Sequence, residues 1–355
     1  MQTHTFSLVT RKRITMNQIL IFIIFVIGYF QLGPAFSHHG FNAHYDVSNT
    51  VFMEGTIKEF RYINPHSFVY IETTNADGEQ ETRWCEMQAS SQLRIKGINE
   101  NSLKVGDRIR VEGFQARRDP LGCEFGTGYL ADGSVLSLRT GSGQSMHYPL
   151  LDEGASQTII GVWYRKSFPG AGIDPDSIQY LTALGARASA LNDPLTSNPV
   201  YRCSPISPVR AWSQPGLPTE IREEGDRIII HHEFMDTERV IHMNLDNHPT
   251  NVVRSEMGHS IGRYEGDEII IETAMFSEGV VRSDFVRTTN FILTERLRIN
   301  KDNGDLEITW EAEDPNYYTE ILYGSRILVR TTLPMGRYDC APGIGHGAQM
   351  DPSLG

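Results

Sequence analysis

Alternating apolar and polar residues mark a series of short strands in the first half of the chain, after residue 50. Apolar side chains recur at every second position or in short β-branched runs, and Gly-Asp or Asp-Gly pairs mark turns. One segment instead has helical spacing, and it falls between the third and fourth strands. Five strands with a helix in that position predict a small closed barrel of the oligonucleotide/oligosaccharide-binding (OB) type. The predicted strands are 51–63, 67–73, 81–87, 105–116 and 126–138, and the helix is 89–98.

A second series of strand-like segments fills the last third of the chain. Their alternation and regular spacing predict an antiparallel sheet that curls into a barrel or a sandwich. A Gly-x-Trp step at Gly161 and Trp163, just before this series, is similar to the start of a lipocalin-like barrel, and an ordinary core tryptophan is the alternative interpretation. The predicted segments are 226–234, 239–246, 260–276, 290–300, 305–315 and 325–333.

These patterns predict a mainly β chain of two domains with a short helical, Pro-rich insert. A length of 355 residues suits two domains that follow a leader. A Gly- and Ser-rich stretch between the two series is typical of a linker. The expected parts are a signal peptide at 1–37, an OB-like barrel at 38–138, a linker at 139–156, an antiparallel lipocalin-like barrel or sandwich at 157–345 with its insert at 169–218, and a tail at 346–355.

The N-terminus has the pattern of a secretory leader. Arg11, Lys12 and Arg13 are basic, an apolar run of about 12 residues follows at 19–30, and small residues offer a cleavage site. The run is shorter than the roughly 20 residues that span a bilayer, so we expect no membrane span in the mature chain. A start at Met16 and an uncleaved anchor remain as alternatives. The predicted location is periplasmic or secreted.

Composition narrows the class of partner. Hydrophobic residues are 39% and charged residues 21% of the chain, as in folded globular proteins. The net charge of −12 argues against a nucleic-acid partner, because nucleic acids bind clustered basic surfaces.

Four cysteines follow the leader, and export favours disulfides. Four cysteines allow three pairings, and the sequence does not choose among them. Pairing within each half is the simplest, because each bond would then close one domain. No Cys-x-x-Cys step occurs, so the spacing does not suggest a zinc site. The cysteines are Cys85, Cys123, Cys203 and Cys340.

Histidines gather at the expected start of the mature chain. Cleavage after Ser37 would make His38 the N-terminal residue, whose amine and ring could hold a metal ion together with a further imidazole. Cleavage after Ala35 would place His38 third, where an amine, two amides and an imidazole form a square-planar site. Both geometries favour copper. The candidate ligands are His38, His39, His44 and His66; a terminus that binds adventitious metal is the alternative.

An Asn64-Pro65-His66 step precedes the second predicted strand. Pro65 has no N–H to donate, which suits the start of a strand. His66 shares a strand face with Phe68 and Tyr70. A hydrogen-bonded histidine packed against an aromatic ring and a ligand contact are both compatible with this placement.

A hairpin is expected at 226–246, with a two-residue turn at Asp236-Thr237. This turn would place His231 opposite His242 and beside Glu233, as a metal or proton-transfer site. It would also place Ile228, Ile230, His232 and Ile241 on one face. A register slip of one residue would remove the histidine pair.

The segment 258–267, Gly-His-Ser-Ile-Gly-Arg-Tyr-Glu-Gly-Asp, ends in a predicted turn at Glu265-Gly266-Asp267. His259 and Ser260 are adjacent, so they are not expected to form a nucleophile–base pair with each other. Of Glu295 and Arg296, one is expected to face the interior of the sheet.

Several of these segments together resemble a known family. His38-His39-x-Phe41 and Asn64-Pro65-His66 resemble the start of a secreted bacterial domain family of unknown function, and 258–267 resembles a Gly-His-Ser-x-Gly-x-aromatic-Glu-Gly-Asp segment found beside that domain. The resemblance covers about four fifths of the chain. Tyr264 stands where the pattern has Trp. No activity follows from the resemblance. The matching positions that it singles out are His38, His39, Asn64, Pro65, His66, His259, Ser260, Gly262, Glu265, Gly266 and Asp267.

Three functions are compatible with the sequence. The preferred one is an exported binding protein that holds a small hydrophobic or amphipathic molecule in the second domain. The alternatives are a copper carrier or metal-dependent oxidoreductase, and a module that docks a protein partner without catalysis. Expected ligand contacts are Trp163, His232, Ser260 and Tyr264. If the protein is an enzyme, the acid–base candidates are His242, His259, Glu265 and Glu295, all expected in a polar barrel interior.

Overall fold

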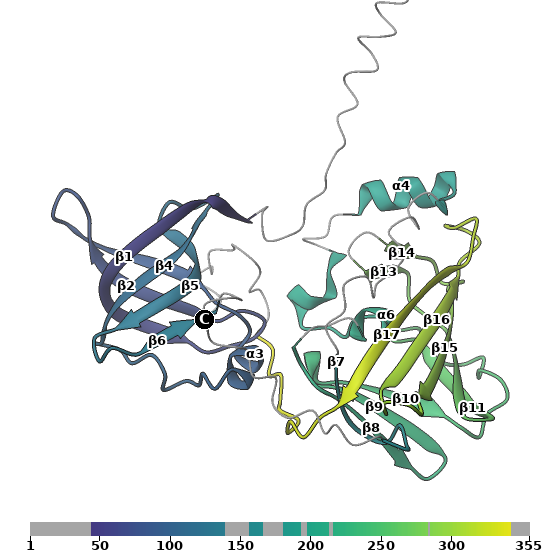
Figure 1. Ribbon diagram of the computed structural model, residues 1–355. Helices are drawn as coiled ribbons and strands as arrows, with labels where there is room; N and C mark the ends of the chain where they lie inside the picture. Colours follow the sequence, from purple (N-terminus) through teal and green to yellow (C-terminus); the bar gives the residue numbers. More distant parts are fainter. Residues whose placement is uncertain are drawn as a thin grey trace, which may run out of the picture. The chain divides into compact units, whose positions relative to one another are not determined.

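The computed structural model describes residues 44–138, 156–165, 180–192, 197–212, 216–282 and 285–341. The described chain is mainly β, with a ring of five strands in its first half and a closed barrel of nine strands in its second half (Figure 1). The predicted fold class is therefore confirmed.

The first-half ring closes in the order β1-β2-β3-β5-β4, because β3 pairs in parallel with β5 and β1 pairs with β4. The short α3 lies between β3 and β4 in the chain, as predicted. We call this ring the small barrel. Its elements are β1 (Tyr45–Arg61), β2 (Phe68–Thr74), β3 (Gln80–Glu86), α3 (Ser90–Ile95), β4 (Arg108–Ala116), β5 (Gly122–Leu130) and the appended β6 (Val135–Ser137).

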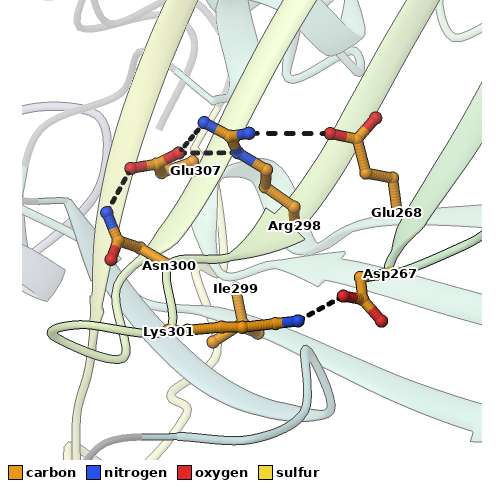
Figure 2. Close-up of a pocket in the computed structure, with 7 residues that line it drawn as sticks. All are labelled: Asp267, Glu268, Arg298, Ile299, Asn300, Lys301 and Glu307. Atoms are coloured by element: carbon orange, nitrogen blue, oxygen red, sulfur yellow. Dashed lines mark hydrogen bonds and ion pairs between the residues drawn. The ribbon is translucent and has the colours of Figure 1, made fainter.

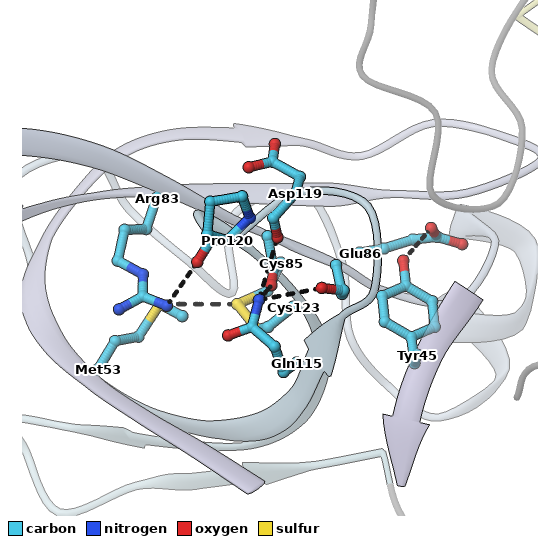
Figure 3. Close-up of a disulfide and its surroundings, with 11 residues drawn as sticks. Tyr45, Met53, Arg83, Cys85, Glu86, Gln115, Asp119, Pro120 and Cys123 are labelled. Atoms are coloured by element: carbon cyan, nitrogen blue, oxygen red, sulfur yellow. Dashed lines mark hydrogen bonds between the residues drawn. A yellow bond between two sulfur atoms is a disulfide. The ribbon is translucent and has the colours of Figure 1, made fainter. Parts of the chain in front are cut away.

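One disulfide closes this ring covalently. Cys85 on β3 and Cys123 on β5 are register partners, and both are fully buried (Figure 3). The apolar side chains around them alternate along the strands and form one core that includes Val69, Ile71 and Phe125. The bond therefore joins the two strands whose pairing closes the barrel.

The second-half barrel, here called the large barrel, has the strand order β7-β8-β9-β10-β11-β12-β15-β16-β17 and closes on itself. Inward residues are mostly aliphatic and fully buried, while outward residues are polar, so each strand shows the predicted alternation. The strands are β7 (Gly161–Arg165), β8 (Thr219–Glu224), β9 (Arg227–His232), β10 (Thr237–His242), β11 (His259–Glu265), β12 (Glu268–Ala274), β15 (Ile292–Ile299), β16 (Leu306–Glu313) and β17 (Leu322–Arg330).

One pairing departs from the predicted antiparallel sheet. β10 and β11 run parallel and share two residue pairs, Ile241 with Ser260 and His242 with Ile261. Their connection is the long segment 243–258, which returns the chain to the same end of the barrel. By comparison, β15 and β16 share eight residue pairs. We call the β10–β11 contact the parallel seam.

The structure adds elements that the pattern did not predict. The strand β8 is charged along most of its length, and a second small hairpin forms at β13 (Gly279–Arg282) and β14 (Phe285–Arg287). The predicted helical part of the insert is present as α4. The helices of this region are α4 (Ala183–Leu191), η2 (Pro199–Arg202) and α6 (Pro208–Ala211).

The β9–β10 hairpin has a different turn from the predicted one. Its loop is Glu233 to Asp236, with Met235 and Asp236 both at positive φ, 61° and 46°. His231 consequently lies opposite Glu238, and His242 lies opposite Arg227, so the predicted His231–His242 pair is wrong. The observed partner of each residue differs from the predicted one by an even number of positions, so each residue remains on the predicted face of the hairpin.

The second disulfide joins Cys203 to Cys340, so the pairing is the one within each half. Two disulfides are consistent with an oxidising compartment outside the cytoplasm. Among the described helices, none is long and apolar enough to cross a membrane.

Removing the Cys85–Cys123 bond, as Cys85→Ala/Cys123→Ala, should destabilise the small barrel by about 4 kcal/mol. The bond joins residues that are 38 positions apart, and its loss increases the conformational entropy of the unfolded chain. Hydrogen exchange of β2 and β4 amides in increasing urea measures the loss. A change below about 1 kcal/mol would show that strand pairing alone closes the ring.

Candidate functional site

The interior of the large barrel is apolar over most of its area. One cluster includes Trp163, Ile230 and Leu306, and a second includes Phe276, Phe291 and Leu293. Polar residues on the inward faces of seven strands interrupt this apolar lining. The polar interior residues are Thr219, His232, Thr237, Arg239, Ser260, Thr273, Glu295 and Arg326.

An ion pair is the centre of this polar group. Arg239 on β10 and Glu295 on β15 are 2% and 0% exposed at their side chains. The guanidinium donates to both carboxylate oxygens: Nη1 lies 3.1 Å from Oε1, and Nη2 contacts Oε2. Such two-point contacts fix orientation as well as charge.

Two hydroxyls complete the shell of the arginine. Arg239 Nε donates to Ser260 Oγ at 3.0 Å, and Nη2 donates to Thr273 Oγ1 at 2.7 Å. Ser260 and Thr273 are register partners on β11 and β12 and lie 2.9 Å apart. Alternation along these strands therefore turns both hydroxyls inward toward the arginine.

Trp212 enters this group from α6 rather than from a strand. The Ser207 Oγ caps α6 by accepting from the Arg210 N–H, and it donates to the Val281 carbonyl. The cap seats Trp212 with its indole N–H donating to Glu295 Oε1 at 2.7 Å. The same indole meets the His232 ring edge-on, at 4.8 Å between centroids.

His232 forms a polar row with one residue on each neighbouring strand. Thr219 on β8 and Thr237 on β10 are both its register partners. The Thr219 hydroxyl lies 2.9 Å from His232 Nδ1. His232 Nε2 and Thr237 Oγ1 are buried and have no hydrogen-bond partner among the described residues.

Burial, reinforced by the charge of Arg239 and by His231, lowers the pKa of His232 from 6.5 to about 3. The imidazole is therefore neutral at physiological pH. When Nδ1 accepts the Thr219 hydroxyl, Nε2 carries the proton and is a donor. Two buried donors thus stand beside an arginine, an arrangement suited to a hydrogen-bond acceptor such as a carboxylate.

The candidate residues do not all share one site. Trp163, His232, Ser260 and Glu295 are interior. Tyr264 has the inward parity of β11 but lies at the strand end and is 61% exposed.

The other acid–base candidates are outside. His242 and His259 lie on the outer face, since their strand neighbours Ile241 and Ser260 point inward. Glu265 is the last residue of β11, has outward parity and accepts a hydrogen bond from Arg263 Nε. The expectation that His242, His259 and Glu265 face the interior is wrong.

Two glycines explain part of the Gly-His-Ser-Ile-Gly pattern. Gly258 has φ +66°, and a Cβ there would lie 2.6 Å from the Ala274 carbonyl oxygen. A Cβ at Gly262 would lie 2.7 Å from Ile241 across the parallel seam. Both positions therefore require glycine so that β11 can approach its neighbours closely.

The small barrel has its own polar contact. Glu86 is 3% exposed and accepts the Tyr45 hydroxyl (Figure 3), while its Oε1 lies 2.9 Å from His66 Nδ1. His44 is also buried, whereas His38 and His39 lie outside the described residues. Within the described ranges, no group of three His, Cys, Asp or Glu side chains is arranged to hold a metal ion.

A cavity of about 400 Å³ lies at the surface where the β11–β12 and β15–β16 turns meet (Figure 2). Lys301 pairs with Asp267, and Arg298 pairs with Glu307 and Glu268. Each charged residue of the lining therefore has a partner of opposite charge, and we assign the cavity no ligand. The lining residues are Asp267, Glu268, Arg298, Ile299, Asn300, Lys301 and Glu307.

Residues 30–123 match the model of a family described as "Family of unknown function (DUF6152)". The matched residues include the His38-His39-x-Phe41 and Asn64-Pro65-His66 segments, and they do not include 258–267. No curated protein matches the chain in sequence.

Three solved structures are similar in fold to part of the chain. They are apo lipid binding protein 8 of Caenorhabditis elegans (11% identity, 48% of this chain and 94% of that one, TM-score 0.26), a point mutant of the fluorescent protein UnaG (12%, 49% and 97%, 0.24) and a secretory abundant heat soluble protein of Ramazzottius varieornatus (12%, 50% and 98%, 0.22).

Sequence reasoning missed Arg239, Thr273 and Trp212. Arg239 and Thr273 each lie two residues from an inward isoleucine of the same strand, so strand alternation could have predicted that they face the interior. Trp212 lies in a Pro-rich stretch, and nothing in its spacing shows that it reaches a barrel.

The low pKa of His232 predicts acid destabilisation. Unfolding restores the ordinary pKa of 6.5, so the unfolded state binds a proton that the folded state refuses between pH 6.5 and about 3. Stability should therefore fall as the pH drops below 6.5, by about 2 kcal/mol at pH 5 from this group.

Urea unfolding at pH 7.5 and 5.0 measures this loss. His232→Gln should lose less stability between the two values than the wild type, whereas His231→Gln on the outer face should match the wild type. Identical losses in the wild type and His232→Gln would contradict a neutral buried imidazole.

Proposed function

We propose that the large barrel binds a small amphipathic molecule, with the polar end of the molecule at His232, Thr237 and Arg239. The observation that carries this proposal is the pair of buried, unpartnered polar atoms, His232 Nε2 and Thr237 Oγ1, beside a buried arginine. Buried polar groups are normally hydrogen-bonded, and leaving one without a partner costs about 1–3 kcal/mol. A ligand oxygen would remove that cost.

The surrounding surface fits the rest of such a molecule. Trp163, Ile221 and Ile230 are fully buried in the cluster that adjoins this row, and no charge is among them. Apolar walls with a few converging polar groups are the usual composition of small-molecule sites.

Trp212 is the side chain best placed to make room. It occupies the interior from α6, so its withdrawal breaks no strand ladder. Its indole N–H would exchange Glu295 for another acceptor or for water. Ligand uptake therefore moves Trp212, while the nine strands stay paired.

Decanoate is a suitable probe, because it combines a carboxylate with a short apolar chain. The wild-type protein should bind it saturably, with a change in tryptophan fluorescence. His232→Leu should weaken binding about tenfold, the equivalent of one hydrogen bond to a charged group. His231→Leu, on the outer face of the same strand, is the matched control and should bind as the wild type does.

The proposal fails if the wild type binds neither decanoate nor any component of a total lipid extract, as judged by native mass spectrometry. It also fails if His232→Leu and His231→Leu bind decanoate equally.

A second candidate function concerns the small barrel. A histidine held by a carboxylate is the common arrangement of a metal ligand, and Glu86 holds His66 in this way. This contact favours the proposal that His66 joins the N-terminal histidines in binding copper. Copper content of the processed protein should then fall in both His66→Ala and His38→Ala variants. Equal copper in both variants and the wild type would remove the idea.

A further inference from the structure

Three histidines and a glutamate gather on the outer face of the large barrel, over the parallel seam. They come from four segments: His242 from β10, His248 from the 243–258 connection, His259 from β11 and Glu272 from β12. These four residues belong neither to the proposed ligand site nor to the turn at 265–268.

His248 makes a hydrogen bond through Nδ1, while its buried Nε2 makes none with the described residues and lies within ion-pair distance of Glu272. Its Nδ1 lies 2.8 Å from His259 Nδ1, and its Nε2 lies 3.3 Å from Glu272 Oε1. The His259 ring in turn stacks on His242, with centroids 4.9 Å apart and planes at 10°. The 243–258 connection is thereby held to β11 and lies within ion-pair distance of β12.

The geometry is that of a shared proton rather than of a metal site. The His248 and His259 centroids are 5.1 Å apart across an N···N distance of 2.8 Å, so the two nitrogens point nearly at each other. One Nδ1 donates and the other accepts, and the accepting ring must carry no proton at that atom. A metal ion bound by both would need the rings to turn away from this line.

We propose that the His248–His259 pair is an acid-sensitive latch that keeps the 243–258 connection closed over the parallel seam. With one proton between the facing nitrogens, one Nδ1 donates and the other accepts, so the hydrogen bond forms. A second proton on these nitrogens leaves an N–H facing an N–H with no acceptor between them and adds one positive charge, and the pair separates. This proposal goes beyond the proposed ligand binding and does not depend on it.

The surrounding groups set the direction of the effect. His242 stacks on the pair, Arg227 lies opposite His242 on β9, Glu272 contacts His248, and the β15 neighbour of Glu272 is the neutral Thr294. Burial, followed by His242 and His248, lowers the pKa of His259 below its ordinary value of 6.5. The opened connection binds the proton more readily, so opening becomes more favourable as the pH falls below 6.5.

The seam is the part of the barrel wall that such an opening would loosen. It has two residue pairs, and on its inner side the Arg239–Ser260 hydrogen bond crosses between the same strands. When the latch is released, the polar interior is separated from solvent at this position only by the strand pair with the fewest residue pairs.

Hydrogen exchange at pH 7.0 and 5.0, corrected for intrinsic rates, tests the latch. Protection of amides in 244–253 and of Ser260 and Ile261 should fall with pH, by up to about tenfold per pH unit for one linked proton. Amides of β15 and β16 should lose protection only by the global loss caused by His232, so a larger loss at the seam than in these strands reports local opening.

His248→Asn removes the second titrating ring but keeps an amide donor near the Nδ1 position. The seam of this variant should lose its acid response, while His231→Asn should respond as the wild type does. Nitrogen NMR of the His259 ring gives an independent readout. At pH 7 one proton should be shared by the two facing Nδ1 atoms, and at pH 5 each Nδ1 should carry its own proton. An equal acid response in His248→Asn and the wild type, or seam protection at pH 7 that falls on adding EDTA, would overturn the proposal.

Discussion

The ion pair between Arg239 and Glu295 constrains the interior of the large barrel more than any other contact in the described chain. Neither charge can be left alone at 2% or less exposure, because an uncompensated buried charge costs several kcal/mol. The pair therefore requires β10 and β15 to hold their registers. It also fixes the inward parity of Ser260 and Thr273, and it gives the Trp212 indole its acceptor.

A buried ion pair is nevertheless weak evidence for stability. Its desolvation commonly cancels its attraction, and matched apolar replacements are often neutral or stabilising. The barrel already has an extensive apolar core, so folding alone does not explain why charge is placed inside it. The ligand binding that we propose, with a polar group recognised inside the barrel, would explain it. The strands β10 and β11 therefore present polar and charged side chains on the inner face of the barrel wall and histidines on its outer face.

The sequence predicted the fold where one rule acted alone. Alternation predicted most strands of both barrels, though not the charged β8, and helical spacing predicted α3, because these segments bury one regular face. The β9–β10 turn was missed because the positive φ of Met235 is not favoured by its residue type. The parallel pairing of β10 and β11 was missed because it depends on how a 16-residue connection folds back, which no local pattern records.

The site was predictable in part. His232, Ser260 and Glu295 were found because a motif or a strand phase singled them out. Arg239 was passed over because arginine normally marks a solvent-facing position. His242 and His259 were placed inside because histidine fits either face. Their contact with His248, which is distant from any motif, became visible only once the 243–258 connection was seen to cross the seam.

The most direct test of the account is the unfolding free energy of Arg239→Met, alone and combined with Glu295→Gln, which keeps an acceptor for Trp212. The account holds that the charges serve recognition. The single variant should then lose about 3–5 kcal/mol, because Glu295 is left buried without its partner, and the double variant should lie within about 1 kcal/mol of the wild type. A double variant as unstable as the single one would show that the ion pair exists to hold the barrel together.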